Sequence, residues 1–490
     1  MQNRNPIKTF SQGVLTFFLL CPFLVLFFHF QISTRWDWNE FWWALRNSIW
    51  QGLWSALLST CGGMALASGL IFCENRFSRW VNFNVFFLLP NFLPNLFILI
   101  GLMSLIDPFP MGSIGVVIVH AFINFGLCGV ILKEVIKTKL SKLSDVAFIL
   151  GAGRLHFYSK VLWPLIRKDI LQVFFLVFVT AFSSFAIPLV VGGGKGINLE
   201  ILIFEKMKIY NDWSTAVLIS GIQSLLLFAF SLMNFNANTV VDVNPHLQSR
   251  FLESRLSFYV FSFLYLVFFY SYFSGVWEGI SSWVDFELYA EEIVTGVFGT
   301  LAISIGVGCA IFALLMLITR LHQTNWFHRF LNGYIAPSTA LVGFAFMVVG
   351  PNTSSFVLLK IVLGLALSYV IYLYKMGYGN YLIELGRYKE KAELLGASEN
   401  QIFWKILFPL TYKRMFLYSG IAAFWATGDY GISKMIANRD ISLALLSETF
   451  LSHYRIGFSS LLSFILLVLG LLVFLAFRGV QIVISRKINY

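Results

Sequence analysis

The chain has 490 residues, of which 58% are hydrophobic, 18% aromatic and only 12% charged, and its mean hydropathy is +0.77. Soluble domains are about 45–50% apolar and about 25% charged, so this composition excludes a water-soluble globule and a disordered chain. The formal net charge is +11. In an apolar chain such a basic excess indicates Lys and Arg gathered in cytoplasmic loops more often than a nucleic-acid partner. We therefore expect membrane lipid, and no nucleic acid, around this chain.

Apolar runs long enough to cross a bilayer, about 20 residues each, predict the helices in chain order. The first half of the sequence supplies six, at 11–32, 48–72, 83–106, 113–133, 169–191 and 213–234. The second half supplies six more, at 256–277, 292–319, 330–350, 354–376, 412–432 and 457–482. The expected fold class is an all-α membrane protein with about 12 transmembrane helices. Prolines interrupt two of the runs, Pro90 and Pro94 the third and Pro337 the ninth.

The first apolar run follows Arg4 and Lys8, as the core of a secretory signal would. It is longer than the roughly 7–15 apolar residues of a cleaved signal, and no small-residue cleavage site follows it. We expect a retained first span.

Basic residues gather in every second loop, whereas the segment between Trp277 and Glu292 holds only acidic charges. By the positive-inside rule the basic loops are cytoplasmic, and so are both termini. The five cysteines, Cys21, Cys61, Cys73, Cys128 and Cys309, show no C-x-x-C spacing. We therefore expect no disulfide framework, no metal site and no cofactor.

A sequence repeat connects the two halves of the chain. Residues 145–165 read DVAFILGAGRLHFYSKVLWPL, and residues 390–410 read EKAELLGASENQIFWKILFPL. Eight of the 21 positions are identical at an offset of 245 residues. This pattern predicts a tandem duplication with halves at 1–235 and 256–490 and a cytoplasmic linker at 236–255. Because each half holds an even number of spans, the halves are expected to be parallel repeats about an axis along the membrane normal.

The repeats lie in two long basic loops, the first at about 134–168 and the second at about 377–414. In the second basic loop, Gly396 is placed to end a helix in a left-handed turn. Ser398 and Gln401 fit a capping box that starts the next helix, and Pro409 marks the return to the membrane. The first basic loop keeps Gly151 and Pro164 but has Gly153 where the cap would be, so its second helix is expected to start less firmly.

Two interpretations of these loops are open. A charged cytoplasmic loop can be a solvated connector, but this pattern occurs twice and includes apolar residues that a solvated connector does not need. Exposed apolar residues on a short helical element usually mark a docking face. The apolar positions are Leu150, Val161 and Trp163 in the first basic loop and Leu395, Ile406 and Phe408 in the second.

At these residues the sequence resembles the E-A-A…G…I-x-L-P loop of type I ABC importer permeases. In that family the loop holds a coupling helix that docks in a groove of a separate cytoplasmic ATPase. The resemblance implies that the following residues dock the ATPase: Asp145, Ala147, Gly151, Ala152, Val161 and Pro164, and Glu390, Ala392, Gly396, Ala397, Ile406 and Pro409. The departures are mild, with Asp for Glu in the first copy and an aromatic residue before each proline.

The resemblance also implies the function and the partners. The layout is similar to fused two-half permeases of the ferric iron, thiamine and polyamine or phosphonate group. It implies a bacterial inner-membrane permease that takes ferric iron, thiamine or a similar small solute from a periplasmic or tethered binding protein by alternating access. The chain carries no nucleotide-binding motif, since Lys195 in GGGKG is not followed by Ser or Thr. A separate ATPase, expected in two copies, would hydrolyse ATP, so the chain itself is not an enzyme.

Three polar residues within the spans are candidates for the translocation pathway: Asp429, its counterpart Ser184 at the 245 offset, and Asn124. An ionisable residue in a span is costly and is by default a functional candidate. The alternative for Asp429 is a position near the outer end, satisfied by water or by Lys434. For Asn124 the alternative is an ordinary hydrogen bond to a neighbouring helix, typically worth about 0.6 kcal/mol.

Two other functions are open. A twelve-span secondary transporter driven by an ion gradient also has parallel repeats, but it predicts coupling charges in both halves, and only Asp429 fits. A membrane-embedded enzyme would need converging His, Asp, Glu or Cys residues, and the seven His are scattered.

Overall fold

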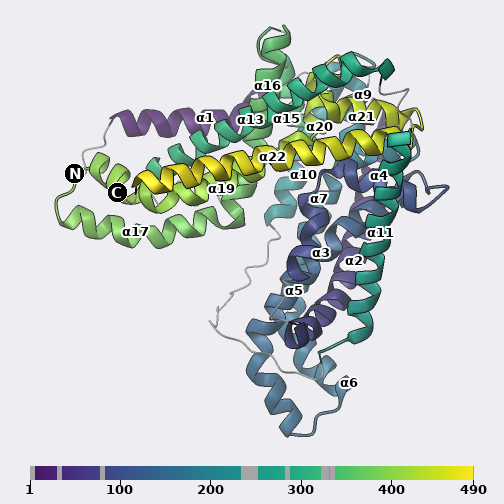
Figure 1. Cartoon of the computed structure of the whole chain (residues 1–490), viewed down its shortest axis with the longest axis vertical. Helices are drawn as coiled ribbons and strands as arrows, with labels where there is room; N and C mark the ends of the chain where they lie inside the picture. Colours follow the sequence, from purple (N-terminus) through teal and green to yellow (C-terminus); the bar gives the residue numbers. More distant parts are fainter. Residues whose placement is uncertain are drawn as a thin grey trace.

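The structure is a computed structural model, and it describes residues 6–29, 36–77, 83–232, 252–281, 287–321, 330–331, 337–351 and 353–488. Within these ranges every regular element is a helix (Figure 1). The all-α prediction is therefore confirmed for the described chain. The predicted linker at 236–255 lies almost entirely outside the described residues.

The first half of the chain forms nine α-helices longer than five residues, one short helix and one π-helical turn. They are α1 (Pro6–Phe28), α2 (Trp38–Phe77), α3 (Phe83–Phe92), α4 (Asn95–Leu105), α5 (Ser113–Ile149), α6 (Arg154–Phe157), η1 (Tyr158–Leu162), α7 (Trp163–Phe182), α8 (Ala186–Val191), α9 (Leu199–Lys208) and α10 (Trp213–Leu232). These bounds follow the apolar runs, but several helices extend beyond them. Helix α5 has 37 residues and runs on into the first basic loop.

The described residues of the second half form ten α-helices and two π-helical turns. Its elements are α11 (Arg255–Ser281), α13 (Ala290–Leu321), α15 (Thr339–Val348), α16 (Ser354–Leu373), η2 (Tyr374–Tyr378), α17 (Gly379–Leu394), α18 (Glu399–Ile402), η3 (Phe403–Leu407), α19 (Phe408–Thr427), α20 (Gly431–Ile436), α21 (Leu443–Ser452) and α22 (Ile456–Ile488). The counterpart of the continuous α5 is broken at Gly377, whose φ is +133°. Only glycine adopts such a φ without strain.

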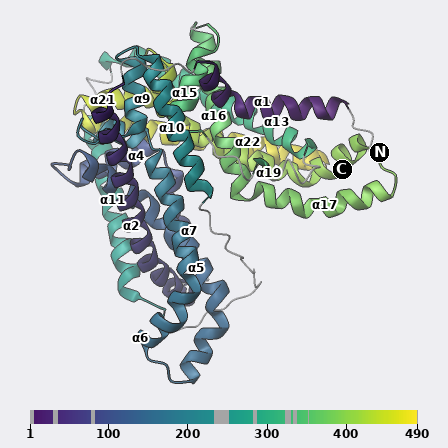
Figure 2. The ribbon, with the colours of Figure 1, turned by 180° about the vertical axis from the view of Figure 1, so that it is seen from behind.

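Two bundles diverge from a shared end of the molecule (Figure 1). One contains α2, α3, α5 and α7, and α11 packs along it. The other contains α13, α16, α19 and α22, and α1 packs along it. The view from behind shows the same divergence, with α6 at the far end of one bundle and α17 toward the far end of the other (Figure 2). The two basic loops therefore lie far apart, at the free ends of the two bundles.

The first helix of each half packs on the other half. Helix α1 contacts α15 and α13 of the second half, and also α10 of its own. Helix α11 contacts α2 and α4 of the first half, as well as α22. The predicted boundaries at 235 and 256 therefore divide the sequence but do not divide the packing.

The number of spans differs from the prediction of twelve. Eight described helices are long and apolar enough to cross a membrane, and the pair α3 and α4, bent by 101°, could make a ninth. Helix α15 has only 10 residues. Helices α7 and α19 have 20 each, but basic residues sit in or next to their first turns. The twelve-span count is thus not confirmed by length and composition.

Elements of the two halves fall at matching positions. Helix α18 begins and ends 245 residues after α6. The first and last residues of η3, α19 and α20 likewise lie 245 residues after those of η1, α7 and α8. The offset found in the 21-residue sequence pattern therefore extends over the helices that follow each basic loop.

Glycines bring α2 and α5 close together. A Cβ atom at Gly63 would lie 2.3 Å from Cβ of Cys128, and one at Gly62 would lie 2.4 Å from the Phe125 ring. Small residues permit close helix packing in membranes, where the hydrophobic effect does not hold helices together. This contact fixes the axis of the bundle that carries the first basic loop.

Replacing Gly63 by valine should therefore destabilise the protein by about 1–3 kcal/mol, the usual cost of overpacking. The measurement is the unfolding temperature of the purified chain in detergent. Gly479→Val is the matched control, because Gly479 is also helical and a Cβ atom placed there would meet no neighbouring segment within 4 Å. Equal unfolding temperatures for the two variants would contradict the packing assignment.

Candidate docking loops and the paired helix breaks

The first basic loop turns sharply at Gly151. Helix α5 ends at Ile149, and Gly151 adopts a φ of +69°. The backbone N–H of Ala152 then donates to the carbonyl oxygen of Ala147 at 3.0 Å, which satisfies one of the carbonyls left free at the helix end. The side chain of Asp145 lies outside the described residues.

The second basic loop has the same turn and a firmer start to its next helix. Gly396 has a φ of +80°, and Ala397 N–H donates to the Ala392 carbonyl at 3.0 Å. Ser398 and Gln401 form a complete capping box at the start of α18. In the first basic loop the backbone carbonyl of Gly153 accepts from Phe157, with no side-chain cap there. The predicted left-handed glycine and the capping box are thus confirmed.

Apolar side chains are exposed at the tip of each loop. Leu150 is 79% exposed and Leu155 is 87% exposed in the first basic loop, and Leu394 and Leu395 are 87% and 88% exposed in the second. Trp163 and Trp404 are also more than half exposed. Hydrophobic residues this exposed, gathered on a short helical turn, are typical of a binding surface.

Two of the predicted docking residues, and one further apolar position of the loops, are less accessible than expected. Val161 packs partly against the core of the first half, and Ile406 and Phe408 pack against a small core of the second basic loop around Ile402 and Phe403. The expectation that these three are exposed apolar positions is wrong. Val161 and Ile406 lie in the π-helical turns η1 and η3, and Phe408 follows η3 directly.

The remaining predicted docking residues differ in how deeply they are buried. Ala147 and Ala392 are buried under the glycine turn, and Ala152 and Ala397 are half-buried. Gly151, Pro164, Glu390 and Gly396 are exposed, and Pro409 is half-buried. The alanines therefore hold the turn together, while the glycines lie open to contact. Sequence reasoning missed Ile149, Leu155 and Leu394, although each lies within four residues of a turn glycine.

An ion pair closes the base of the first basic loop. Lys139 Nζ of α5 lies 2.7 Å from Asp169 Oδ2 of α7, and the Asp169 side chain is only 3% exposed. At the 245 offset the second half has Glu384 and Arg414, which are opposite in charge. There the Arg414 guanidinium lies 3.4 Å from the centroid of the Tyr381 ring, and the Tyr381 hydroxyl donates to the Leu410 carbonyl at 2.8 Å. Each loop base is thus held by a different polar contact.

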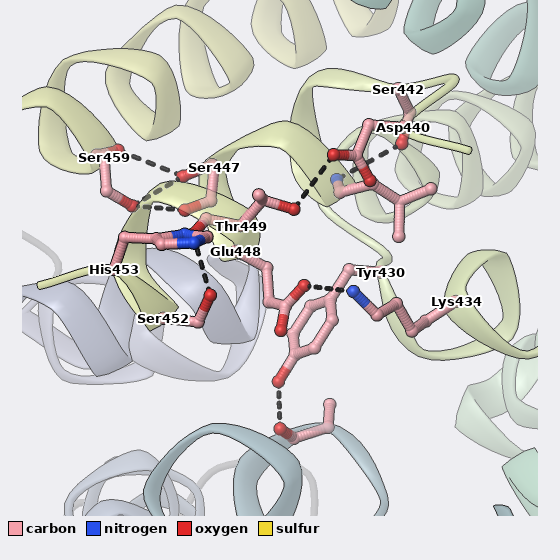
Figure 3. Close-up of polar contacts among 12 residues, drawn as sticks. Tyr430, Lys434, Asp440, Ser442, Ser447, Glu448, Thr449, Ser452, His453 and Ser459 are labelled. Carbon is pink, nitrogen blue, oxygen red and sulfur yellow. Dashed lines mark hydrogen bonds and ion pairs between the residues drawn. The ribbon is translucent and has the colours of Figure 1, made fainter. Parts of the chain in front are cut away.

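The helices that follow the loops both break near the contact between the halves. Helix α7 ends at Phe182 and α8 starts at Ala186, and α19 ends at Thr427 and α20 starts at Gly431. The two breaks are connected, because the Tyr430 hydroxyl donates to the backbone carbonyl of Ala186 (Figure 3). Ser184 and Asp429 lie in these breaks.

Both breaks have internal hydrogen bonds. Asn198 Nδ2 donates to the Ser184 carbonyl at 2.7 Å, and Asp429 Oδ2 accepts from the Ile432 backbone N–H at 3.1 Å. Asp429 and Ser184 are partly exposed. Asn124 is different, because it is buried and donates to the His120 carbonyl of its own helix at 2.8 Å. The alternative for Asn124 is a hydrogen bond to a neighbouring helix, whereas this bond lies within α5 itself.

Lys434 does not pair with Asp429. Its Nζ lies 2.7 Å from Glu448 Oε2, and this pair connects α20 to α21 (Figure 3). The Glu448 side chain is only 10% exposed. The alternative in which Lys434 satisfies Asp429 is therefore wrong. At the 245 offset the first half has Leu189 and Ile203, which carry no charge, so the ion pair has no counterpart at the matching positions of the first half.

Side chains that could ligate a metal are dispersed over the fold. Among the described residues, no group of three or more His, Cys, Asp or Glu side chains could hold a metal ion.

Residues 59–243 match the family of binding-protein-dependent transport system inner membrane components. The matched segment contains the first basic loop and both helices that flank it. Together with the relatives below, this match supports the resemblance to type I ABC importer permeases of the fused, two-half form.

Several of the relatives are thiamine permeases. The chain is 23% identical to the thiamine transport system permease protein ThiP of Escherichia coli, over 90% of this chain and 89% of that protein. It is 26% identical to ThiP of Salmonella typhimurium, over 46% of this chain and 47% of that protein. For ThiP of Haemophilus influenzae the identity is 29%, over 39% of each chain. The last two alignments thus span half or less of those relatives. No solved structure matches the chain.

The ion pair at the base of the first basic loop gives a testable prediction. Lys139→Met would leave Asp169 buried and unpaired, which typically costs about 3–5 kcal/mol, so we expect a lower unfolding temperature in detergent and faster proteolysis of the loop. The exchanged pair, Lys139→Asp with Asp169→Lys, should recover most of the loss, because it keeps two opposite charges in contact at the base of the loop. A double variant as unstable as Lys139→Met would contradict a charge-pair role.

Proposed function

We propose that this chain is the membrane permease of an ATP-driven importer that moves thiamine or a closely similar solute into the cytoplasm. The solute would arrive on a periplasmic or tethered binding protein, and two copies of a separate ABC ATPase would supply the energy. The names of the relatives support the solute, and favour thiamine over ferric iron. The family match supports the partners, since its members are described as binding-protein-dependent.

The observation that carries the proposal is the pair of matching loops. Each has a left-handed glycine, a short second helix and exposed leucines at the tip. A motor with two equivalent subunits needs two such sites, one for each subunit. Their separation at the free ends of diverging bundles supports a mechanism in which ATP-driven closure of the motor brings them together.

Force could pass from each loop to the middle of the molecule along a single helix. Helices α7 and α19 each start directly after a loop and have 20 residues, or about 30 Å at 1.5 Å per residue. Each ends at the break where the halves touch. Movement of the loops would therefore reach the breaks, which supports alternating access as the transport mechanism.

The proposal includes the membrane topology. Two parallel six-span halves, with both termini and both basic loops in the cytoplasm, are supported by the charge of the loops and by the 245-residue offset of the following helices. In this arrangement α7, α19 and the short helices beside the breaks contribute crossings that length and composition alone do not reveal.

Replacing both turn glycines tests the docking role. Gly151→Val and Gly396→Val place a β-branched residue at a positive φ, which L residues with branched side chains rarely adopt. A Cβ atom at either site would meet no neighbouring segment within 4 Å, so the effect should stay in the loops. We expect the double variant to reach the membrane but to lose pull-down of its ATPase.

Gly386→Val is the control, because Gly386 lies on α17 within the second basic loop but away from its turn, and a Cβ atom there would meet no neighbouring segment within 4 Å. Retained ATPase association in the double variant would count against the docking role. Thiamine uptake by proteoliposomes of the chain alone, driven by an ion gradient, would instead support a secondary transporter.

A further inference from the structure

Asp429 is a carboxylate without a cationic partner in the described structure. Its carboxylate accepts hydrogen bonds from the backbone N–H groups of Ile432 and Ser433, and the nearby Lys434 is paired with Glu448. No ion pair of Asp429 is present among the described residues. A charged group in such an apolar protein is costly unless it is paired. The position therefore favours a cation that arrives from outside the chain.

Aromatic side chains accompany this carboxylate. Trp425, four residues before Asp429, contacts Tyr369 of α16 edge to face at 5.7 Å between ring centroids. It also stacks with Phe92 of α3 at 6.4 Å and an interplanar angle of 16°. The buried Nε1 of Trp425 has no hydrogen-bond partner within the described residues.

Both halves of the chain contribute to this region. Gly428 lies against Pro94, since a Cβ atom at Gly428 would be 2.1 Å from Cβ of Pro94. Pro94 and Phe92 belong to the break between α3 and α4, whereas Trp425 lies near the end of α19 and Asp429 lies in the break between α19 and α20. Any movement of one half past the other would therefore change the spacing of the rings and the carboxylate.

We propose that Asp429, Trp425, Tyr369 and Phe92 form a contact site for an aromatic cation in transit. The proposal rests on the function proposed above and specifies the chemistry of its solute. Aromatic faces attract cations, most strongly Trp, and a carboxylate compensates a positive charge directly. Thiamine fits this class because its thiazolium ring is both aromatic and positively charged. The site is assembled from both halves, so it is altered when they move.

The alternative is that Asp429 only caps α20. Asparagine separates the two roles, because its side-chain oxygen caps a helix N-terminus about as well as that of aspartate but carries no charge. Asp429→Asn should therefore fold and reach the membrane normally. Asp429→Glu keeps the charge and moves it by about one methylene.

The test is uptake of radiolabelled thiamine by proteoliposomes that contain the full chain with its ATPase and binding protein. We expect Asp429→Asn to lower the initial rate about tenfold, in line with loss of a strong charge contact, and Asp429→Glu to retain more activity than Asp429→Asn. Asp440→Asn is the matched control, because Asp440 is an exposed carboxylate that accepts from Thr449 at 2.9 Å. Its uptake should be unchanged.

The aromatic part of the site has its own pair of variants. Trp425→Leu removes the ring and should reduce uptake, whereas Trp425→Phe keeps a ring and should retain more. ATPase pull-down and the amount of chain in the membrane should be the same for all variants. These two readouts are the ones that a merely structural role would change.

The outcomes separate the two proposals. Thiamine uptake that is unchanged in Asp429→Asn would overturn the contact site and leave the importer function standing. Equal losses in Asp429→Asn and Asp429→Glu, with less protein in the membrane, would assign Asp429 to folding and also overturn the site. Absence of thiamine uptake by the unmodified complex, with the ATPase still bound, would overturn the thiamine-type solute and the site with it.

Discussion

The structure depends on one constraint: backbone N–H and C=O groups freed at a helix break need partners where water is scarce. This chain satisfies them locally at both central breaks. The Ser184 carbonyl accepts from Asn198, the Ile432 N–H donates to Asp429, and the Ala186 carbonyl accepts from the Tyr430 hydroxyl. The last bond crosses between the halves. The breaks are therefore stable features of the fold, and they lie where the two bundles meet.

The two halves share a backbone plan but differ in their charges. The first half closes its basic loop with Lys139 and Asp169, and the second uses Arg414 over Tyr381. The second half alone has the pair Lys434 and Glu448 beside its break. It alone interrupts the helix that leads into the loop, at Gly377. Fusion in one polypeptide allows such differences, since each half can specialise while the other retains the common plan.

Much of the local structure could be predicted from the sequence, because the signals are local. Gly396, Ser398 and Gln401 define a turn and a cap within six residues, and the structure has both. The exposure of Ile406 and the partner of Lys434 could not be predicted, because they depend on a π-helical turn and on a contact between separate helices. The span count failed for a related reason. A rule that looks for about 20 apolar residues does not recognise helices that break or bend within the protein.

The exchange of first helices has a consequence for biosynthesis. Helix α1 is made first, yet its principal neighbour, α15, is made more than 300 residues later. Until then one apolar face of α1 has only lipid or helices made earlier to contact. Helix α11 finds α2 and α4 already in place, so it can tie the second half to the first as it emerges from the ribosome. A covalent connection keeps α15 near α1 at high effective concentration. Two separately made subunits would instead have to find each other by diffusion.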